Sequence, residues 1–269
     1  SYPSPLKLLK LTKWLSREKP DVVQTWMYHS DLIGGAAARL AGCSTIWNIR
    51  QSDLDPGSSK RATIWTAKIC ASLSRFIPHR IVCCSQASRI VHRSLGYDEG
   101  RMLVIGNGID FTRFLPDQGA RHDIRHELGI GDETPLIGLV ARYHPQKDHR
   151  SFITAAAEIV RRHSDVHFLL CGEDITERND ELMGWINEAG IAGHCHLLGM
   201  RDDLPRINAA LDLSLSTSAY GEGFPNVLIE AMACGVPCVT TDVGDSALIV
   251  GDRDHVVEPR DPGGIAGAV

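Results

Sequence analysis

The chain has 269 residues, a length that accommodates one large or two modest domains. Hydrophobic residues make up 43% and charged residues 23%, which excludes a disordered chain, a collagen-like chain and a heptad coiled coil. The apolar runs are too short for a membrane-spanning helix, which needs about 20 residues. The eight cysteines have no regular spacing, so we expect reduced thiols in a cytoplasmic protein.

The net charge of −5 conceals an uneven distribution of charge along the chain. Residues 1–116 contain 16 Lys and Arg against 8 Asp and Glu, whereas residues 117–269 contain 12 against 25. Such a division predicts two domains with different partners. The basic half is suited to an anionic surface or ligand. We expect no nucleic-acid partner, because no stacking aromatics are interleaved with the basic residues.

The first half of the chain alternates short β-branched runs with helical stretches. After a helix at 5–17, strands are predicted at 21–26, 45–50, 80–85 and 102–105. Helices are predicted between them at 31–40, 60–75 and 86–95.

The second half repeats this alternation. After a short helix at 122–128, strands are predicted at 136–142, 166–171, 194–198, 213–216 and 237–241, with helices at 149–163, 179–189, 203–211 and 225–234. Apolar runs without polar alternation, separated by helices, are typical of parallel sheets covered on both faces. The chain is therefore predicted to be an α/β protein with two doubly wound, Rossmann-like sheets.

The predicted domain boundary lies between Pro116 and Ala120, where the charge changes sign and a short helix precedes a new strand series. It divides the chain into domains at 1–116 and 117–269. Both ends of the chain interrupt a pattern, so we expect both domains to be incomplete.

Two segments of the second half carry candidate chemistry beyond the carboxyl ends of predicted strands, where open α/β sheets bind ligands. The first is RYHPQK, in which Arg142 and Lys147 leave a strand end together. A forked guanidinium and a flexible ammonium suit a diphosphate. The alternative interpretation is a solvated turn before a helix.

The second segment is YGEGFPNVLIE, at residues 220–230. Gly221 and Gly223 permit a tight loop, and Pro225 suits the first position of a helix. The amides around Asn226 would then point out of the helix N-terminus, a natural phosphate site. Glu230 lies in an otherwise apolar helix, where a carboxylate is costly to bury unless it has a partner or a ligand. The alternative is a salt-bridged helix carboxylate.

Together these motifs resemble glycosyltransferase family 4, the retaining group with the GT-B architecture of two facing Rossmann-like domains. Further matching segments are IGNGID at 105–110, residues 197–199 and MACGVPCVTT at 232–241. The resemblance extends over about residues 21–259 and is strongest in the second half.

The resemblance implies a role for each site residue. Arg142 and Lys147 would stabilise the leaving nucleoside diphosphate, and Glu222 would accept hydrogen bonds from the transferred sugar. The remaining donor-binding residues would be Gly221, Gly223, Phe224, Pro225, Asn226, Glu230, Leu198, Gly199 and Arg201. Glu230 would hold the ribose, and the base would lie against the backbone near 198–201. The first domain would bind the acceptor, with His29 or Arg50 as the candidate residue there.

Catalysis in this scheme depends on positioning and charge stabilisation, with no cofactor and no obligatory metal ion. One motif points elsewhere: Asp53, Leu54 and Asp55 form a DxD triplet, which a different glycosyltransferase architecture uses to bind a metal. We interpret it as a polar loop, because that architecture would not carry the second-half motifs.

The predicted function is transfer of a sugar from a nucleotide sugar to a glycan or lipid-linked acceptor, in cell-envelope or exopolysaccharide assembly. The rival functions are a GT-B-shaped sugar-nucleotide epimerase and a non-catalytic nucleotide-sugar-binding module. At helical spacing, Leu8, Leu11 and Leu15 fall on one face of the first helix, with lysines nearer the other. That helix either covers the sheet only, or also places the protein peripherally on the anionic cytoplasmic leaflet.

Overall fold

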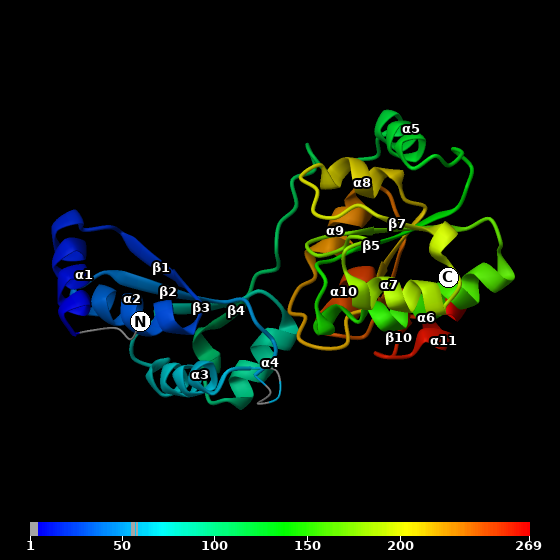
Figure 1. The fold of residues 1–269 in the computed structure, drawn as a ribbon. Helices are drawn as coiled ribbons and strands as arrows, with labels where there is room; N and C mark the ends of the chain where they lie inside the picture. The colour runs from blue at the N-terminus through cyan, green and yellow to red at the C-terminus, as the bar shows by residue number, and fades with distance from the viewer. Residues whose placement is uncertain (1–4, 55–56, 58) are drawn as a thin grey trace. The chain divides into compact units, whose positions relative to one another are not determined.

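The computed structural model describes residues 5–54, 57 and 59–269. The chain divides into two compact units, Ser1–Asn107 with Glu222–Phe224, and Gly108–Gly221 with Pro225–Val269 (Figure 1). The division at Asn107 precedes the predicted boundary between Pro116 and Ala120. The reason is that Phe114 and Ala120 both pack into the hydrophobic core of the second unit.

The first unit contains a parallel sheet in the order β1-β2-β3-β4. Its strands are β1 (Val22–Trp26), β2 (Ser44–Ile49), β3 (Arg80–Cys83) and β4 (Met102–Val104), and its helices are α1 (Pro5–Glu18), α2 (Tyr28–Leu40), α3 (Arg61–Leu73) and α4 (Gln86–Ser94), with a 3₁₀ turn η1 (Glu99–Arg101). All four predicted strands are therefore present, each within two residues of its expected limits.

The helices of the first unit cover one face of its sheet (Figure 1). The four strands follow one another across the sheet in chain order, and each crossover between neighbours is right-handed. The crossover helices α2, α3 and α4 therefore lie on the same side of the sheet. Trp47 and Ile49 of β2 point into that layer and are fully buried. On the other face, Val22, Trp26 and Leu103 remain 45–53% exposed, and none of the described helices covers them. Parallel sheets are normally covered on both faces, so this apolar surface is unusual.

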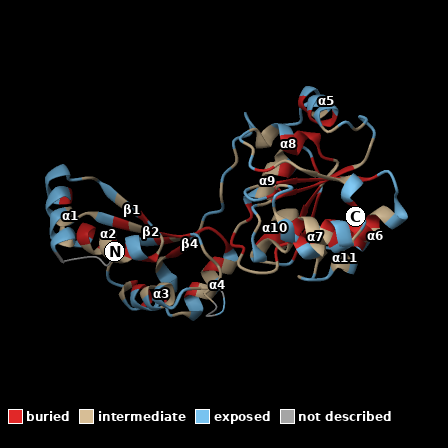
Figure 2. Ribbon diagram, in the orientation of Figure 1, coloured by how far each residue is buried: buried red, intermediate tan, exposed pale blue. Residues whose placement is uncertain are grey.

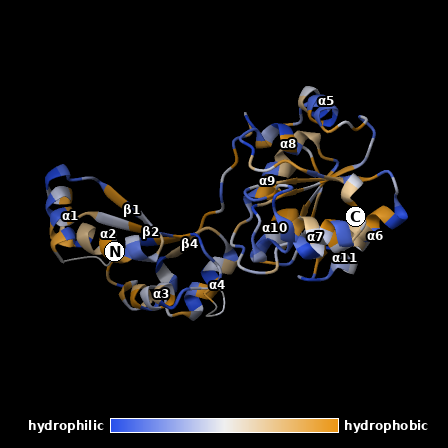
Figure 3. Ribbon diagram, in the orientation of Figure 1, coloured by the Kyte–Doolittle hydropathy of each residue, from blue (hydrophilic) through white to orange (hydrophobic). Residues whose placement is uncertain are grey.

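Helix α1 uses one face to extend the helical layer. Leu15 is buried against Ala37 and Ala38 of α2, with Leu8 and Leu11 packed beside it. The predicted apolar face of the helix is thus confirmed as a packing face. Figure 3 shows that hydrophobic residues also occur elsewhere along this helix.

The second unit contains a six-stranded parallel sheet in the order β10-β9-β8-β5-β6-β7. Its strands are β5 (Leu136–Val140), β6 (His167–Cys171), β7 (Cys195–Leu197), β8 (Leu213–Ser216), β9 (Cys238–Thr241) and β10 (Val256–Val257). Its helices are α5 (Gln118–Glu127), α6 (His149–Arg162), α7 (Asp180–Glu188), α8 (Leu204–Ala210), α9 (Asn226–Ala233), α10 (Ser246–Val250) and α11 (Pro262–Ala268), with 3₁₀ turns η2 (Pro145–Lys147), η3 (Ala192–His194) and η4 (Arg253–His255).

Both faces of this sheet are buried, as the apolar strand sequences predict. Ile137 and Leu139 of β5 point toward α6, α7 and α11, whereas Leu136 and Val140 point toward α5, α8 and α9. This alternation follows from the two-residue period of a strand and explains why every residue of β5 is apolar and buried. Figure 2 shows the resulting concentration of buried residues in the strands of this unit.

Two further observations bear on the sequence predictions. All eight cysteines are free, and six of them are buried. In the part of the chain that the structure describes, no helix is both long and apolar enough to cross a lipid bilayer.

Candidate active site

The strand order of the second unit has a topological switch point between β5 and β8. From β5 the chain proceeds outward to β6 and β7, and it then returns to the other side of β5 to form β8. Crossovers diverge at such a point and leave a crevice beyond the carboxyl ends of the two strands, where ligands bind. Both candidate segments, 142–147 and 220–230, follow these two strands.

Arg142 and Lys147 lie in the loop that joins β5 to α6. Arg142 is exposed, and its side chain makes no hydrogen bond or ion pair within the described residues. The short turn η2 follows, and Asp148 then adopts a left-handed conformation (φ 49°) while its carboxylate caps α6 at the amide of Ser151. The loop therefore has a defined conformation, because a non-glycine residue remains in this region only where its surroundings hold it.

Hydrogen bonds fasten this loop to the segment after β8. Thr217 Oγ1 donates to the carbonyl of Lys147 at 2.8 Å, and the amide of Ala219 donates to the carbonyl of Gln146 at 2.8 Å. Thr241, at the end of β9, donates in turn to the carbonyl of Ser218 at 2.6 Å. The Lys147 loop and the start of the glycine-containing loop thus form one connected backbone structure. Sequence reasoning missed Thr217, although the run of hydroxyl residues STS before the glycine loop was an available signal.

The glycine-containing loop leads directly into α9. Gly221 has φ 74°, a left-handed conformation that favours glycine. Helix α9 begins at Asn226, so Pro225 is the N-cap and not the first helical residue, and its side chain provides no capping bond. Pro225 has no amide hydrogen, so the first backbone donors of this helix are the amides of Asn226 and Val227. An anionic oxygen is the natural partner of such a helix end.

Glu230 lies on α9, one turn beyond these amides. Its side chain is half-buried, and within the described residues it takes part in no hydrogen bond or ion pair. Burial raises the pKa of its carboxyl above the ordinary value, and no neighbouring cation opposes this effect. The structure therefore contradicts the alternative of a salt-bridged helix carboxylate. Glu222, in the loop, is buried as well.

The ends of β6 and β7 approach the end of β5 closely. A Cβ atom on Gly172 would lie 2.2 Å from the carbonyl oxygen of Ala141, so only glycine fits there. The amide of Gly172 donates to the carbonyl of Gly199, whose own amide donates to the carbonyl of Ile175. These contacts fix the backbone at Leu198 and Gly199. Arg201 follows, but its guanidinium is occupied by a bidentate pair with Asp203 and by Glu127. The Arg201 side chain is therefore engaged within the unit, and the base-binding role of residues 198–201 stays a prediction.

The acceptor-side candidates both lie at the carboxyl edge of the first sheet. His29 is exposed in the first turn of α2, and its Nε2 lies 3.4 Å from Thr66 Oγ1. Arg50 follows β2, and its guanidinium donates to Asn107, which follows β4. The structure thus positions Arg50 against a second strand end, whereas His29 has a weaker contact.

The metal-binding alternative is only partly covered by the structure. Asp55 of the DxD triplet lies outside the described residues, so the triplet has no structural account. Within the residues that are described, no three His, Cys, Asp or Glu side chains are grouped so that they could hold a metal ion.

Comparison with known proteins identifies the family. Residues 134–269 match the family model described as "Glycosyl transferases group 1", and residues 1–113 match "Glycosyltransferase Family 4". The chain is 27% identical over 252 residues to the UDP-Gal:alpha-D-GlcNAc-diphosphoundecaprenol alpha-1,3-galactosyltransferase of Escherichia coli, covering 92% of this chain and 64% of the relative. It is 31% identical over 207 residues to D-inositol 3-phosphate glycosyltransferase 2 of Catenulispora acidiphila, covering 68% of this chain and 45% of that protein. The chain therefore spans less than two thirds of the length of these relatives.

Solved structures share the fold. The HepE protein of Anabaena, crystallised with UDP, superposes with a TM-score of 0.87 at 23% identity, covering 97% of this chain and 71% of HepE. Sucrose-phosphate synthase of Thermosynechococcus elongatus superposes with a TM-score of 0.80 at 19% identity, covering all of this chain and 70% of the synthase. The fold is thus of the GT-B type, with two Rossmann-like parallel-sheet domains. The match of both halves of the sequence to adjoining family models, on this fold, places the chain in glycosyltransferase family 4.

Proposed function

We propose that the chain carries the two domains of a retaining glycosyltransferase that moves a sugar from a nucleotide sugar to a glycan or lipid-linked acceptor. The partnerless Glu230 carboxylate carries the proposal. A half-buried carboxylate costs free energy unless a ligand compensates it, and a ribose offers the hydroxyl donors that would do so. The rival functions of epimerase and non-catalytic module gain no support from the relatives, which are named as glycosyltransferases.

The names of two similar proteins support a more specific proposal for the donor and the acceptor. The name of the E. coli relative specifies a UDP-galactose donor and a diphosphoundecaprenol-linked acceptor, and HepE binds UDP. We extend this to the present chain as a UDP-sugar donor and a polyprenyl diphosphate-linked or growing glycan acceptor. The expected setting is cell-envelope or exopolysaccharide assembly at the cytoplasmic face of the membrane.

In the proposed reaction the charge of the leaving UDP is stabilised by protein groups. The Arg142 guanidinium and the Lys147 ammonium would contact the diphosphate, together with the backbone amides at the start of α9. Glu222 would accept hydrogen bonds from the transferred sugar. This arrangement requires no metal ion, because the two cations supply the positive charge.

The outer face of α1 supports peripheral attachment to an anionic membrane. It exposes Leu6, Leu9 and Trp14 at 70%, 55% and 50%, beside the exposed cations of Lys10 and Lys13. Apolar side chains and a Trp flanked by basic residues are typical of helices that lie in the membrane interface. The packing face and the exposed face are separate, so the helix can cover the sheet and also contact lipid.

Calorimetric titration of UDP into the chain and into Glu230→Ala tests the proposal. The variant is expected to bind UDP about 10- to 100-fold more weakly, because a charged hydrogen-bond acceptor contributes about 1.5–3 kcal/mol. Glu133→Ala is the matched control, since Glu133 is an exposed carboxylate in the same unit but away from the switch point. Equal UDP affinity for the folded Glu230→Ala variant and the parent chain would refute the ribose assignment.

The retaining outcome has its own measurement. Proton NMR of the first product formed by the full-length protein should show the anomeric configuration of the donor. An inverted product would contradict a retaining reaction and leave UDP binding untouched.

A further inference from the structure

The second unit has a cavity of about 240 Å³ that the proposed donor site does not use. It lies between the loop after β5 and the helices α6 and α7, which are side by side (Figure 1). Its lining consists of Tyr143, His144, Pro145, Asp148, His149, Arg150, Glu181 and Trp185. Of the described residues proposed to bind the donor, none lines it.

The base of the cavity contains a buried imidazole without a hydrogen-bond partner. His149 is 2% exposed, and neither ring nitrogen forms a hydrogen bond within the described residues. Burial lowers its pKa to about 4, an effect that Lys147 strengthens, so the ring is neutral at physiological pH. The Ala141 carbonyl favours the protonated ring slightly but completes no hydrogen bond with it. A neutral imidazole has one donor and one acceptor nitrogen, and leaving both unmet in a buried position is costly.

The wall of the cavity is aromatic and continuous. The ring centroids of Tyr143 and Trp185 are 6.1 Å apart with their planes tilted by 39°, and Tyr143 and His149 are 5.2 Å apart. A flat ring inserted between two others needs about 7 Å, twice a van der Waals contact of about 3.5 Å. The rings therefore form one wall and leave no slot for a nucleobase between them.

The rim of the cavity is polar and charged. Glu181 accepts a hydrogen bond from the Tyr143 hydroxyl at 2.7 Å, and its carboxylate has capacity for further donors. Arg150 is exposed on the opposite element, α6, and offers donors only. An acceptor, Glu181, and a donor, Arg150, thus lie at the rim of one apolar wall.

We propose that this cavity binds one pyranose ring of a glycan, at a subsite separate from the donor site. A pyranose has an apolar C–H face for the Tyr143 and Trp185 wall, and hydroxyl groups that both donate and accept. Those hydroxyls match the carboxylate of Glu181 and the guanidinium of Arg150 at the rim, whereas the buried His149 ring contributes to the wall only. A cavity of about 240 Å³ lies below the range of about 300–1,000 Å³ for drug-sized ligands, so it favours a smaller ligand such as a single ring. The inference goes beyond the proposed transfer reaction and does not depend on it.

Fluorine NMR of the chain labelled with 5-fluorotryptophan tests this subsite directly. Trp185 is the one tryptophan between residues 108 and 269, and the Trp185→Phe variant assigns its resonance. Titration with methyl glycosides of glucose, galactose, mannose and N-acetylglucosamine should shift this resonance saturably for at least one sugar. The four tryptophans of the first unit should not respond.

Two variants and a competitor decide the result. Glu181→Gln should raise the dissociation constant of the responding sugar at least about tenfold, while Glu188→Gln, an exposed carboxylate on the same helix, should leave it unchanged. The dissociation constant should be the same with and without saturating UDP.

The outcomes that overturn the subsite are distinct from failure of the proposed function. No response to any of the four sugars, or an equal response in Glu181→Gln and Glu188→Gln, refutes it. Competitive displacement of the sugar by UDP also refutes it, because the cavity would then belong to the donor site. Absence of UDP binding would refute the proposed donor site and leave the sugar titration valid.

Discussion

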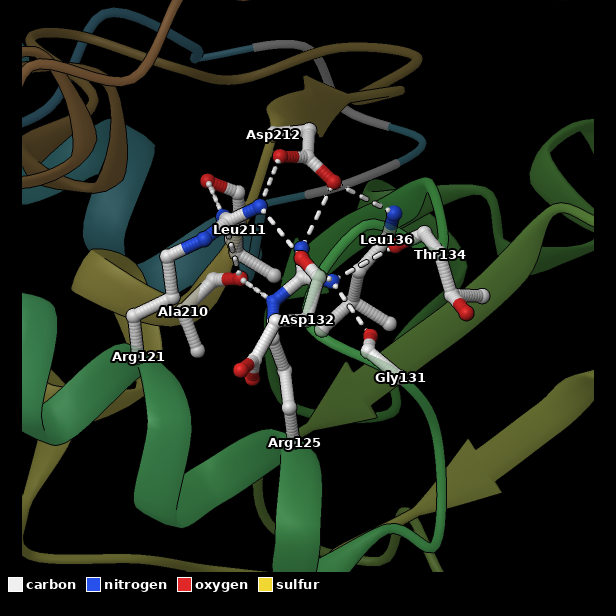
Figure 4. Close-up of polar contacts among 9 residues, drawn as sticks. All are labelled: Arg121, Arg125, Gly131, Asp132, Thr134, Leu136, Ala210, Leu211 and Asp212. Carbon is white, nitrogen blue, oxygen red and sulfur yellow. Dashed lines mark hydrogen bonds and ion pairs between the residues drawn. The ribbon is translucent and has the colours of Figure 1, made fainter.

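Replacing Arg125 by methionine is expected to destabilise the second unit strongly. Arg125 is fully buried at the end of the sheet opposite the candidate site, and its guanidinium forms five hydrogen bonds (Figure 4). These go to the carbonyls of Ala210 (3.1 Å), Gly131 (3.2 Å), Asp132 (2.9 Å) and Thr134 (2.6 Å) and to the Asp212 carboxylate (2.6 Å). Methionine has a similar length but none of these donors.

The magnitude follows from the partners that the substitution leaves behind. Breaking a fully buried ion pair by removing one partner costs about 3–5 kcal/mol, and this range is an upper limit here because the Asp212 side chain is 38% exposed. Asp212 would keep Arg121 at 2.7 Å and the Leu136 amide at 2.8 Å, and Arg121 also contacts the carbonyls of Ala210 and Asp132. The carbonyls of Gly131 and Thr134 would lose their guanidinium donor without that compensation. We therefore expect the lower end of the range, about 3 kcal/mol, a large part of a typical unfolding free energy of about 5–15 kcal/mol.

Urea unfolding measured by the assigned fluorine resonance of 5-fluorotryptophan at position 185 reports this effect in the second unit alone. With a typical slope of about 1–3 kcal/mol per molar urea, the midpoint should fall by about 1–3 M. The probe matters because the chain has two units, so a single two-state transition cannot be assumed for the whole molecule.

Arg206→Met is the matched control. Arg206 pairs with the exposed Asp123 at 2.8 Å, and such surface pairs contribute at most about 1 kcal/mol. Arg125→Lys should restore only part of the loss, because one ammonium cannot replace the fork. If Arg125→Met shifted the midpoint no more than Arg206→Met, the cluster in Figure 4 would not be a stability determinant and the reasoning would be wrong.

Four further predictions concern charges elsewhere in the chain. Asp31 is fully buried with one carboxylate oxygen unpartnered, and burial raises its pKa to about 7. Because its folded pKa exceeds the unfolded value of 3.8, its contribution to stability falls as the pH rises from about 4 to 7. Asp31→Asn should therefore have a free energy of unfolding up to about 4 kcal/mol above that of the parent at pH 8, but little above it at pH 4. A difference in melting temperature that does not depend on pH in calorimetric melts would contradict this. The pKa of Glu230 is raised by burial in the same sense, so Glu230→Gln should raise the melting temperature at pH 8 more than at pH 4 while weakening UDP binding, and a lowered melting temperature at pH 8 would count against it. Arg142→Ala should reduce sugar transfer by the full-length protein, whereas EDTA should leave the transfer rate unchanged. EDTA inhibition that Mg²⁺ or Mn²⁺ reverses would contradict this and favour metal binding by the DxD triplet. Finally, the full-length protein should sediment with anionic but not neutral liposomes at low salt, and Lys10→Glu with Lys13→Glu should abolish this; equal sedimentation with both liposomes would defeat the membrane proposal.

The strands of the second unit were predictable because burial on two faces leaves little freedom in their sequences. Every residue of Leu136–Val140 is apolar, since each side chain enters one of two cores. The strand Val256–Val257 was not predicted, because two residues are too few to show an alternating pattern. The five-residue helix Ser246–Val250 was not predicted either, since it is short and has no side-chain cap at its start. Helix α2 begins at Tyr28, earlier than predicted, and its N-cap residue Met27 (φ 68°) provides no capping side chain that would mark this start in the sequence.

The candidate site was predictable in its loops but not in its connections. Arg142 and Lys147 indicate a diphosphate because they follow a predicted strand end, and the family resemblance implies the ribose role of Glu230. The hydrogen bond from Thr217 to the Lys147 carbonyl joins residues 70 positions apart, so no local sequence pattern predicts it. The same holds for the cavity beside His149, because its wall requires Trp185 from another helix.

The two ends of β5 and β8 show how the unit separates stability from binding. At the amino end, Asp212 is partly buried, yet the Leu136 amide and the guanidinium groups of Arg121 and Arg125 outweigh that burial and hold the pKa of its carboxyl below the ordinary value. At the carboxyl end, burial raises the pKa of Glu230, and no described residue compensates it. A fold stabilised by its own contacts satisfies its buried charges, so an unsatisfied charge is expected where a ligand completes the structure. At the amino ends of these two strands the buried charges are paired with protein groups, whereas at the carboxyl ends the carboxylate of Glu230 is not. The carboxyl ends are therefore where the nucleotide sugar is expected to bind.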